Sequence, residues 1–229
     1  MTGLDVFEAI HTARALRKLK PDPVPEGLIT RILDAAIRAP SAGNAQNWAF
    51  VVVRDPEQRR KLGAIYRKAS DIASAMYAAR GRPAHVTEAQ FQRMMSSGAY
   101  LWDHMADAPV ILIPCQKQPA LPAPDRLPPD MAARYADEQH YVERVRGASL
   151  YPAVQNVILA CRALGLATLI TTNHVRCEAE VKDVLGIPDD VATFAMMPIG
   201  YPVGEFGPVT RRPVGEIAHA DRWSQPWTG

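Results

Sequence analysis

The pattern of apolar positions along the chain predicts helices that alternate irregularly with short strands. Apolar residues at helical spacing predict helices over residues 4–13, 25–39, 56–79, 87–105, 131–146, 150–164 and 178–185. Continuous apolar runs predict strands over residues 48–53, 108–114, 167–171 and 192–199. Because about 50 residues separate the first two strands, a regular alternation of strand and helix is not expected. The pattern therefore predicts the α+β fold class.

Proline interrupts this pattern in the middle of the chain. Six of the sixteen residues from 114 to 129 are proline, which disfavours helix and central strand. We therefore expect an extended surface excursion over about 114–130. The polar helix expected at about 131–146, which carries Tyr135, His140 and Tyr141, is a possible lid over a site. Its polarity favours the alternative, a solvated helix face.

Composition and charge exclude several classes of protein. The 229 residues are 48% hydrophobic and 22% charged, which is typical of a globular chain, and we expect one domain over residues 1–229. The formal net charge is +2 with scattered cations, so no nucleic-acid partner is expected. No apolar run approaches the length of roughly 18 residues that a membrane span needs, and no leader pattern is visible, so no membrane partner is expected. Cys115, Cys161 and Cys177 form no CxxC pair, which favours a reducing, cytoplasmic location.

The usual catalytic motifs are missing, and a different kind of chemistry remains. The sequence contains no GxSxG, GxGxxG, P-loop or HExxH motif, and its six histidines show no metal-ligand spacing, so neither a catalytic triad nor a metal site is expected. Cationic and amide donors instead gather near predicted element ends: Arg14, Arg17, Ser41, Asn44, Gln46 and Arg211. Guanidinium groups suit phosphate oxygens, and amides suit a heterocycle that both donates and accepts. A nucleotide-like cofactor fits these donors; a solvated helix end and an ordinary turn are the alternatives.

Several segments together resemble one known family. Residues 14–19 (RALRKL), 21–25 (PDPVP) and 39–48 (APSAGNAQNW) resemble the N-terminal signature of the nitroreductase family, flavoproteins that bind FMN. Residues 152–160 and 163–166 resemble the central helix of that family. Residues 199–202 and 211–213 resemble its closing strand and phosphate-binding arm. The resemblance spans nearly the whole chain and is weakest between about residues 56 and 146.

This resemblance implies a mixed sheet flanked by helices and an intertwined homodimer, with two FMN sites that are each built from both subunits. The cofactor-binding positions it implies are Arg14, Ala15, Arg17, Pro40, Ser41, Asn44, Gln46, Thr171, Thr172 and Arg211. Arg14 and Arg17 would reach the phosphate, ribityl and pyrimidine side, and Arg211 the phosphate. Ser41 and Asn44 would come from the partner subunit, and residues 171–173 would present backbone N–H groups to flavin N5. Ala13 and Ala15 stand where many members carry an arginine and a serine, and Asn47 stands where proline is frequent.

The function implied is that of an FMN-dependent oxidoreductase. It would pass a hydride from NAD(P)H through the flavin to nitroaromatic, quinone or similar small-molecule acceptors in a ping-pong cycle. No protein side chain is expected to perform the chemistry, and Arg17 is the candidate that stabilises charge at flavin N1/O2. The alternatives are reductive dehalogenation or oxygen-dependent flavin fragmentation on the same scaffold, and a non-catalytic flavin-binding protein. The choice between NADH and NADPH stays open, because no Rossmann fingerprint is present.

Overall fold

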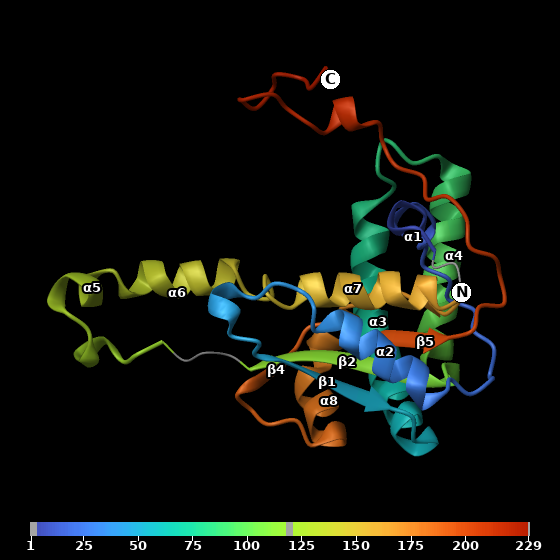
Figure 1. Ribbon diagram of the computed structural model, residues 1–229, viewed down its shortest axis with the longest axis horizontal. Helices are drawn as coiled ribbons and strands as arrows, with labels where there is room; N and C mark the ends of the chain where they lie inside the picture. Colours follow the sequence, from blue (N-terminus) through green and yellow to red (C-terminus); the bar gives the residue numbers. More distant parts are fainter. Residues whose placement is uncertain (1–3, 118–120, 229) are drawn as a thin grey trace.

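A five-stranded sheet lies at the centre of the protein, whose computed structural model describes residues 4–117 and 121–228 (Figure 1). The strand order is β1-β2-β5-β3, and β4 also pairs with β2. The strands are β1 (Trp48–Val53), β2 (Val110–Lys117), β3 (Ala167–Thr168), β4 (Val191–Thr193) and β5 (Met197–Gly200). Among the described residues all strand pairings are antiparallel, whereas a mixed sheet was expected. The predicted α+β class is confirmed.

Helices cover both faces of this sheet. They are α1 (Val6–Thr12), α2 (Glu26–Ala36), α3 (Pro56–Arg80), α4 (Glu88–His104), α5 (Pro129–Ala133), α6 (Tyr135–Arg144), α7 (Tyr151–Ala163) and α8 (Glu178–Leu185). Side chains of β2 alternate between two cores, as the period of two in a strand requires. Val110 and Leu112 pack with α2 and α7, and Ile111 and Ile113 pack with α3 and α8. Buried on both faces, β2 reads in the sequence as a continuous apolar run.

The predicted strand ends at Pro114, and the expectation that residues 115–117 belong to the surface excursion is wrong. Strand β2 continues to Lys117, and Pro114 pairs with Phe50 of β1. The carbonyl of Pro114 accepts a hydrogen bond from the Phe194 N–H at 3.0 Å, so the proline nitrogen faces the same side. On that side, β2 pairs with β5 as far as Leu112 and with β4 from Cys115 onward. The missing N–H therefore interrupts neither ladder.

Further elements differ from the prediction by more than their end residues. The run at 192–199 divides into β4 and β5, and the strand expected at 167–171 ends at Thr168, after which Thr171 forms a single bridge with Met196. The helix expected at 131–146 is two helices, α5 and α6, and α5 begins earlier, with Pro129 at its first position. The expected surface excursion is thereby reduced, within the described ranges, to residues 121–128.

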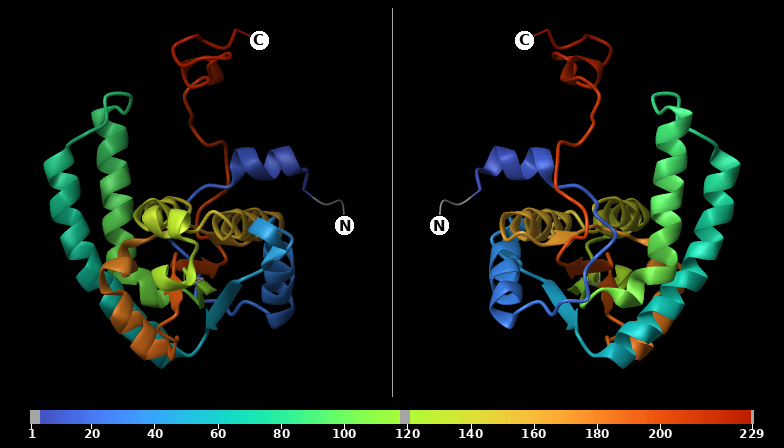
Figure 2. Two further views of the ribbon diagram at one scale, coloured as in Figure 1. Left: turned by 90° about the vertical axis from the view of Figure 1, so that its left-hand side faces the viewer. Right: turned by 90° about the vertical axis from the view of Figure 1, so that its right-hand side faces the viewer.

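Two parts of the chain extend beyond the sheet and its covering helices. Helices α3 and α4 run side by side past the sheet (Figure 2), and the C-terminal segment after β5 leaves the body. That segment carries Trp223, which is 85% exposed, and Trp227, which is also exposed. In the two stretches that the structure describes, no helix combines the length and apolarity needed to cross a bilayer. All three cysteines are free and buried.

Candidate functional site

A cavity of about 680 Å³ lies between α3, α4 and residues 169–173. Its size is typical of sites for small molecules and cofactors. Apolar and aromatic side chains, among them Phe91, Met95 and Trp102 of α4, form most of its wall. Of the predicted cofactor-binding residues, Arg17, Thr171 and Thr172 line this cavity. The fold thus brings Arg17 to the same cavity as Thr171 and Thr172, which are more than 150 residues away in the sequence.

Arg17 brings a cation to the cavity without a carboxylate beside it. Its Nη1 donates to the Ser97 Oγ at 3.1 Å and to the Ala15 carbonyl at 3.3 Å. Burial lowers the pKa of Arg17, because desolvation disfavours the charged form, and the nearby Tyr66 opposes this effect. Arg17 forms no ion pair within residues 4–117 and 121–228, and the described lining includes neither aspartate nor glutamate. A half-buried cation of this kind favours an anionic ligand.

Tyr66 is a cavity residue that sequence reasoning missed. It is only 2% exposed, and its hydroxyl lies 3.0 Å from the Thr171 Oγ1. Burial raises the pKa of Tyr66, while hydrogen bonds with Thr171, Ser70 and Asn173 act in the opposite direction. The available signal was a phenol next to the predicted apolar stripe of α3, between Leu62 and Ser70, because a buried tyrosine hydroxyl needs a partner.

The turn at residues 171–173 offers a free backbone donor at Thr172. The Thr171 N–H donates to the Met196 carbonyl at 3.2 Å, and the Met196 N–H donates back to the Thr171 carbonyl at 2.9 Å. The exposed Thr172 has an N–H with no acceptor in the described part of the chain. Asn173 is buried. Its Nδ2 donates to the Ser70 Oγ, and its Oδ1 accepts from the Arg176 Nη1. Of the first two residues in this turn, Thr172 rather than Thr171 therefore has an N–H free for a ligand.

The loop after α2 does not reach this cavity within one protomer. The Ser41 Oγ accepts a hydrogen bond from the Gln46 N–H at 3.1 Å, and the Gln46 Nε2 donates to the Asn44 Oδ1 at 3.0 Å. Positive φ angles at Gly43, Asn44 and Gln46 shape the loop. It is anchored by the Ala42 N–H, which donates to the Ser149 Oγ at 3.1 Å. Pro40 is exposed at its start.

Arg14 and Arg211 lie on neighbouring segments outside the cavity lining. The Val209 N–H donates to the His11 carbonyl at 3.0 Å, which places the C-terminal segment beside the residues after α1. A Cβ added at Gly207 would lie 3.8 Å from the Arg14 Nη1. Both arginines are exposed, and the Arg211 Nη1 donates to the Thr210 carbonyl at 2.8 Å. The two predicted phosphate donors thus share one side of the protein, although they come from opposite ends of the chain.

These residues fit a flavin mononucleotide. Apolar walls suit a planar ring system, and the Arg17 guanidinium and the Thr172 N–H supply donors for the polar edge of such a ring. The exposed Arg14 and Arg211 are available for a phosphate. The described residues hold no cluster of histidine, cysteine, aspartate and glutamate suited to a metal ion.

Comparison with known proteins identifies the family. Residues 10–201 match the model described as the nitroreductase family. The chain is 32% identical over 222 residues to a protein named NADH dehydrogenase from Thermus thermophilus. The aligned region covers 93% of this chain and 95% of that protein. It is 25% identical over 202 residues to iodotyrosine deiodinase 1 from Rattus norvegicus. Here the aligned region covers 88% of this chain and 64% of the relative.

Solved structures share the fold. The NADPH:FMN oxidoreductase from Vibrio harveyi complexed with NAD+ has a TM-score of 0.65 and 19% identity, over 96% of this chain and 78% of that one. An iodotyrosine deiodinase bound to FMN and 3-iodo-L-tyrosine also has a TM-score of 0.65, with 18% identity, over 95% and 99% of the two chains. With the family model matched over most of its length, the chain belongs to the nitroreductase family.

Proposed function

We propose that this protein, an FMN-dependent oxidoreductase of the nitroreductase family, takes a hydride from NAD(P)H and delivers it to a nitroaromatic, a quinone or a similar small-molecule acceptor in a ping-pong cycle. The observation that carries the proposal is the cavity of about 680 Å³, whose lining includes Arg17, which has no carboxylate partner among the described residues, and Thr172, whose N–H is free. Both residues line the same cavity, and neither donor is a nucleophile or a general base. The side chains present therefore suit a reaction that a bound cofactor performs.

FMN, when bound, supplies the hydride-accepting and hydride-donating ring. The contribution of the protein is to bind and orient. Arg17 places positive charge where negative charge develops at N1/O2, and the low dielectric around the half-buried guanidinium strengthens that interaction. Thr172 would offer its N–H to N5, and the apolar side chains of α4 in the cavity wall would exclude water from the flavin ring. Ala15 contributes through its carbonyl, which accepts a hydrogen bond from Arg17 and orients it.

A homodimer completes the site in this proposal. Helix α1 exposes Val6, Phe7 and Ile10, and the C-terminal segment exposes Trp223. A monomer gains no stability from such apolar exposure, so these surfaces suit a second copy of the chain. The loop with Pro40, Ser41, Asn44 and Gln46 lies away from the cavity of its own protomer, and the partner's cavity is the place where it would act. A cytoplasmic location remains the expectation for this reducing chemistry.

Reductive dehalogenation is the second candidate. It is supported by the similarity to iodotyrosine deiodinase 1, at 25% identity over 88% of this chain. The same cavity and the same donors would serve it, since the acceptor changes while the flavin site does not. The exposed polar helix α6 contributes no residue to the described lining of this cavity within one protomer, so a lid role for it would require the cavity of a second copy. Flavin fragmentation and mere flavin storage have no specific observation in their favour.

An anaerobic spectrum of the purified protein tests the function. We expect a yellow dimer whose flavin absorbance is bleached by NADPH or NADH and returns on addition of a nitroarene or a quinone. Recovery with an iodophenol alone would favour dehalogenation. Flavin that binds but is not bleached would identify a storage protein, and loss of the flavin in the presence of oxygen would indicate fragmentation. Colourless, monomeric protein that does not bind added FMN would contradict the proposal.

A further inference from the structure

The cavity carries more positive charge than one flavin edge needs. Three arginines line it, Arg17, Arg80 and Arg82, and the described lining contains no aspartate and no glutamate. Apolar walls focus the field of such cations into the cavity and raise the local concentration of anions. Arg17 belongs to the proposed flavin site. The proposed flavin site gives no role to the other two, Arg80 at the end of α3 and Arg82 in the turn that follows.

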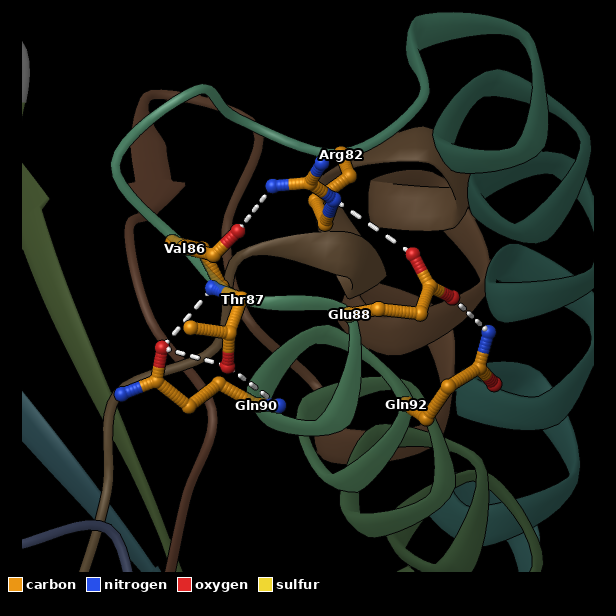
Figure 3. A network of polar contacts seen from close by, with 6 residues as sticks. All are labelled: Arg82, Val86, Thr87, Glu88, Gln90 and Gln92. Atoms are coloured by element: carbon orange, nitrogen blue, oxygen red, sulfur yellow. Dashed lines mark hydrogen bonds and ion pairs between the residues drawn. The ribbon is translucent and has the colours of Figure 1, made fainter.

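Arg82 is committed to the turn between α3 and α4. Its Nη1 donates to the Val86 carbonyl, and its Nε lies 3.4 Å from the Glu88 Oε2 (Figure 3). Thr87 and Gln90 cap α4 reciprocally at the same turn: the Thr87 Oγ1 accepts from the Gln90 N–H, and the Gln90 Oε1 accepts from the Thr87 N–H. The turn is therefore rigidly built, and the charge of Arg82 is balanced by a carboxylate.

Arg80 has neither of these partners. It is exposed in the last turn of α3 and forms no ion pair and no side-chain hydrogen bond with any described residue. Beside it, Tyr77, Phe91 and Met94 form an apolar wall. A free guanidinium over such a wall suits a ligand that combines an anionic group with a flat or apolar body.

The position of Arg80 along α3 separates it from the flavin donors. Arg80 follows Tyr66 by 14 residues in one continuous helix, which at 1.5 Å per residue corresponds to about 21 Å. Tyr66 lies beside Arg17 and Thr171. A small acceptor stacked on a ring at Tyr66 would not span this distance. A dinucleotide, with its nicotinamide at one end and its phosphates several bonds away, would.

We propose that Arg80 binds a phosphate group of the reduced dinucleotide while the nicotinamide lies at the Arg17 and Tyr66 end of the cavity. The proposal rests on the proposed function, because it assigns a second binding element to the same site. Both the pyrophosphate and the 2′-phosphate of NADPH are anionic phosphate groups that a guanidinium can bind. Arg80 thus binds the electron donor, and it takes no part in binding the flavin or the acceptor.

The test compares the holoenzyme with its Arg80→Gln variant. Calorimetric titration with NADP+ is expected to show binding weakened roughly ten- to a hundredfold, as the loss of a charge-assisted hydrogen bond implies. Flavin reduction by 1-benzyl-1,4-dihydronicotinamide, which has no phosphate, should be unchanged, and so should the FMN content. The exposed Arg93 of α4, which is outside the cavity lining and forms no ion pair with described residues, supplies the control Arg93→Gln.

Titration with NAD+ distinguishes the two phosphate sources. Equal weakening of NAD+ and NADP+ would assign Arg80 to the pyrophosphate, and weakening of NADP+ alone would assign it to the 2′-phosphate. Unchanged NADP+ binding, or an equal effect of Arg93→Gln, would overturn the proposal. Slower reduction by the phosphate-free donor or loss of FMN would overturn it too, because Arg80 would then serve the flavin. A wild-type protein that binds FMN but is reduced by no donor would instead refute the proposed function.

Discussion

The hydroxyl of Tyr66 and the Oγ1 of Thr171 lie 3.0 Å apart, although 105 residues separate them in the chain. Tyr66 is in the middle of α3, and Thr171 opens the turn that exposes the free N–H of Thr172. The contact therefore joins the longest described helix to the turn that the flavin would meet. It acts on the site by holding this turn in place.

Removal of the Tyr66 hydroxyl should loosen that turn. We expect Tyr66→Phe to lower the free energy of unfolding by about 0.5–1.5 kcal/mol, the usual contribution of one hydrogen bond, and to weaken FMN binding. Urea denaturation of the apoprotein and fluorescence titration with FMN measure the two effects. Tyr77→Phe is the matched control, because Tyr77 lines the same cavity but is exposed. Equal effects of the two variants would contradict the role assigned to Tyr66.

The charge of Arg17 should set the flavin potential. Loss of a charge-assisted hydrogen bond of about 1.5–3 kcal/mol corresponds to a decrease of roughly 30–60 mV for a two-electron couple. Arg17→Ala should lower the midpoint potential by this amount and slow flavin reduction, and spectroelectrochemical titration measures it. Arg17→Lys, which keeps the charge, should restore part of the potential. Unchanged reduction kinetics of Arg17→Ala at saturating FMN would refute the N1/O2 role.

Arg211 and Arg14 should act on the phosphate of the cofactor alone. Arg211→Ala is expected to weaken FMN binding roughly ten- to a hundredfold, because a charge-assisted hydrogen bond to phosphate is lost. Riboflavin, which lacks the phosphate, should bind the variant and the wild type equally, and Arg14→Ala should show the same pattern to a smaller degree. The exposed neighbour Arg212 provides the control Arg212→Ala. If Arg212→Ala shows the loss instead, the phosphate ligand is misassigned.

His174 should make the fold sensitive to acid. It is fully buried, neither ring nitrogen has a hydrogen-bond partner, and burial lowers its pKa from 6.5 to about 4. Between these two values the unfolded chain binds a proton that the folded chain excludes, so the free energy of unfolding falls as the pH drops from about 6.5 toward 4. The total loss from this residue is about 3 kcal/mol.

Replacement of this histidine tests the assignment. His174→Leu should reduce the pH dependence of unfolding between about pH 6.5 and 4, because the variant lacks the imidazole that takes up a proton only in the unfolded chain. Urea denaturation at several pH values measures it. The exposed His85 gives the control His85→Gln, which should keep the wild-type slope. A slope that persists in His174→Leu would place its origin in other residues.

Gly147 should tolerate no side chain. Its φ is +81°, and a Cβ there would lie 2.8 Å from the Tyr151 Cε2 and 2.9 Å from the Phe194 Cε1. Gly147→Ala should cost roughly 2–5 kcal/mol of stability, from backbone strain and overpacking together. Gly165 has a similar φ of +72° but open space around it, so Gly165→Ala should cost only about 1–2 kcal/mol. Thermal denaturation compares them, and equal losses would show that the ring contacts at Gly147 are unimportant.

Much of the fold could be read from local patterns. Helix α3 begins at Pro56 after the cap residue Asp55, and α4 begins after Thr87, whose side chain accepts from the Gln90 N–H. Such signals act over three or four residues, so the sequence displays them directly. The donors Arg14 and Arg17 were also visible, because they follow a short amphipathic helix within a familiar segment.

The break between β4 and β5 and the continuation of β2 beyond Pro114 to Lys117 were not visible in the same way. Pro114 is compatible with β2 only because its nitrogen faces the place where the neighbouring strand changes. That change depends on how residues 191–200 pair with β2, and a local pattern carries no information on such register.

The sequence by itself determined where most helices and strands form, which family signature the chain carries and which cations stand near its ends. The tertiary structure alone decided that Tyr66 meets Thr171, that Met196 engages the Thr171 N–H and leaves that of Thr172 free, and that Arg80 lies without a partner in a cavity whose described lining has no carboxylate. The physical reason is the separation in sequence of the residues that interact. Helix and strand formation depends on neighbours a few residues apart, whereas burial, pairing and the charge balance of a cavity depend on segments that only the packed fold brings together.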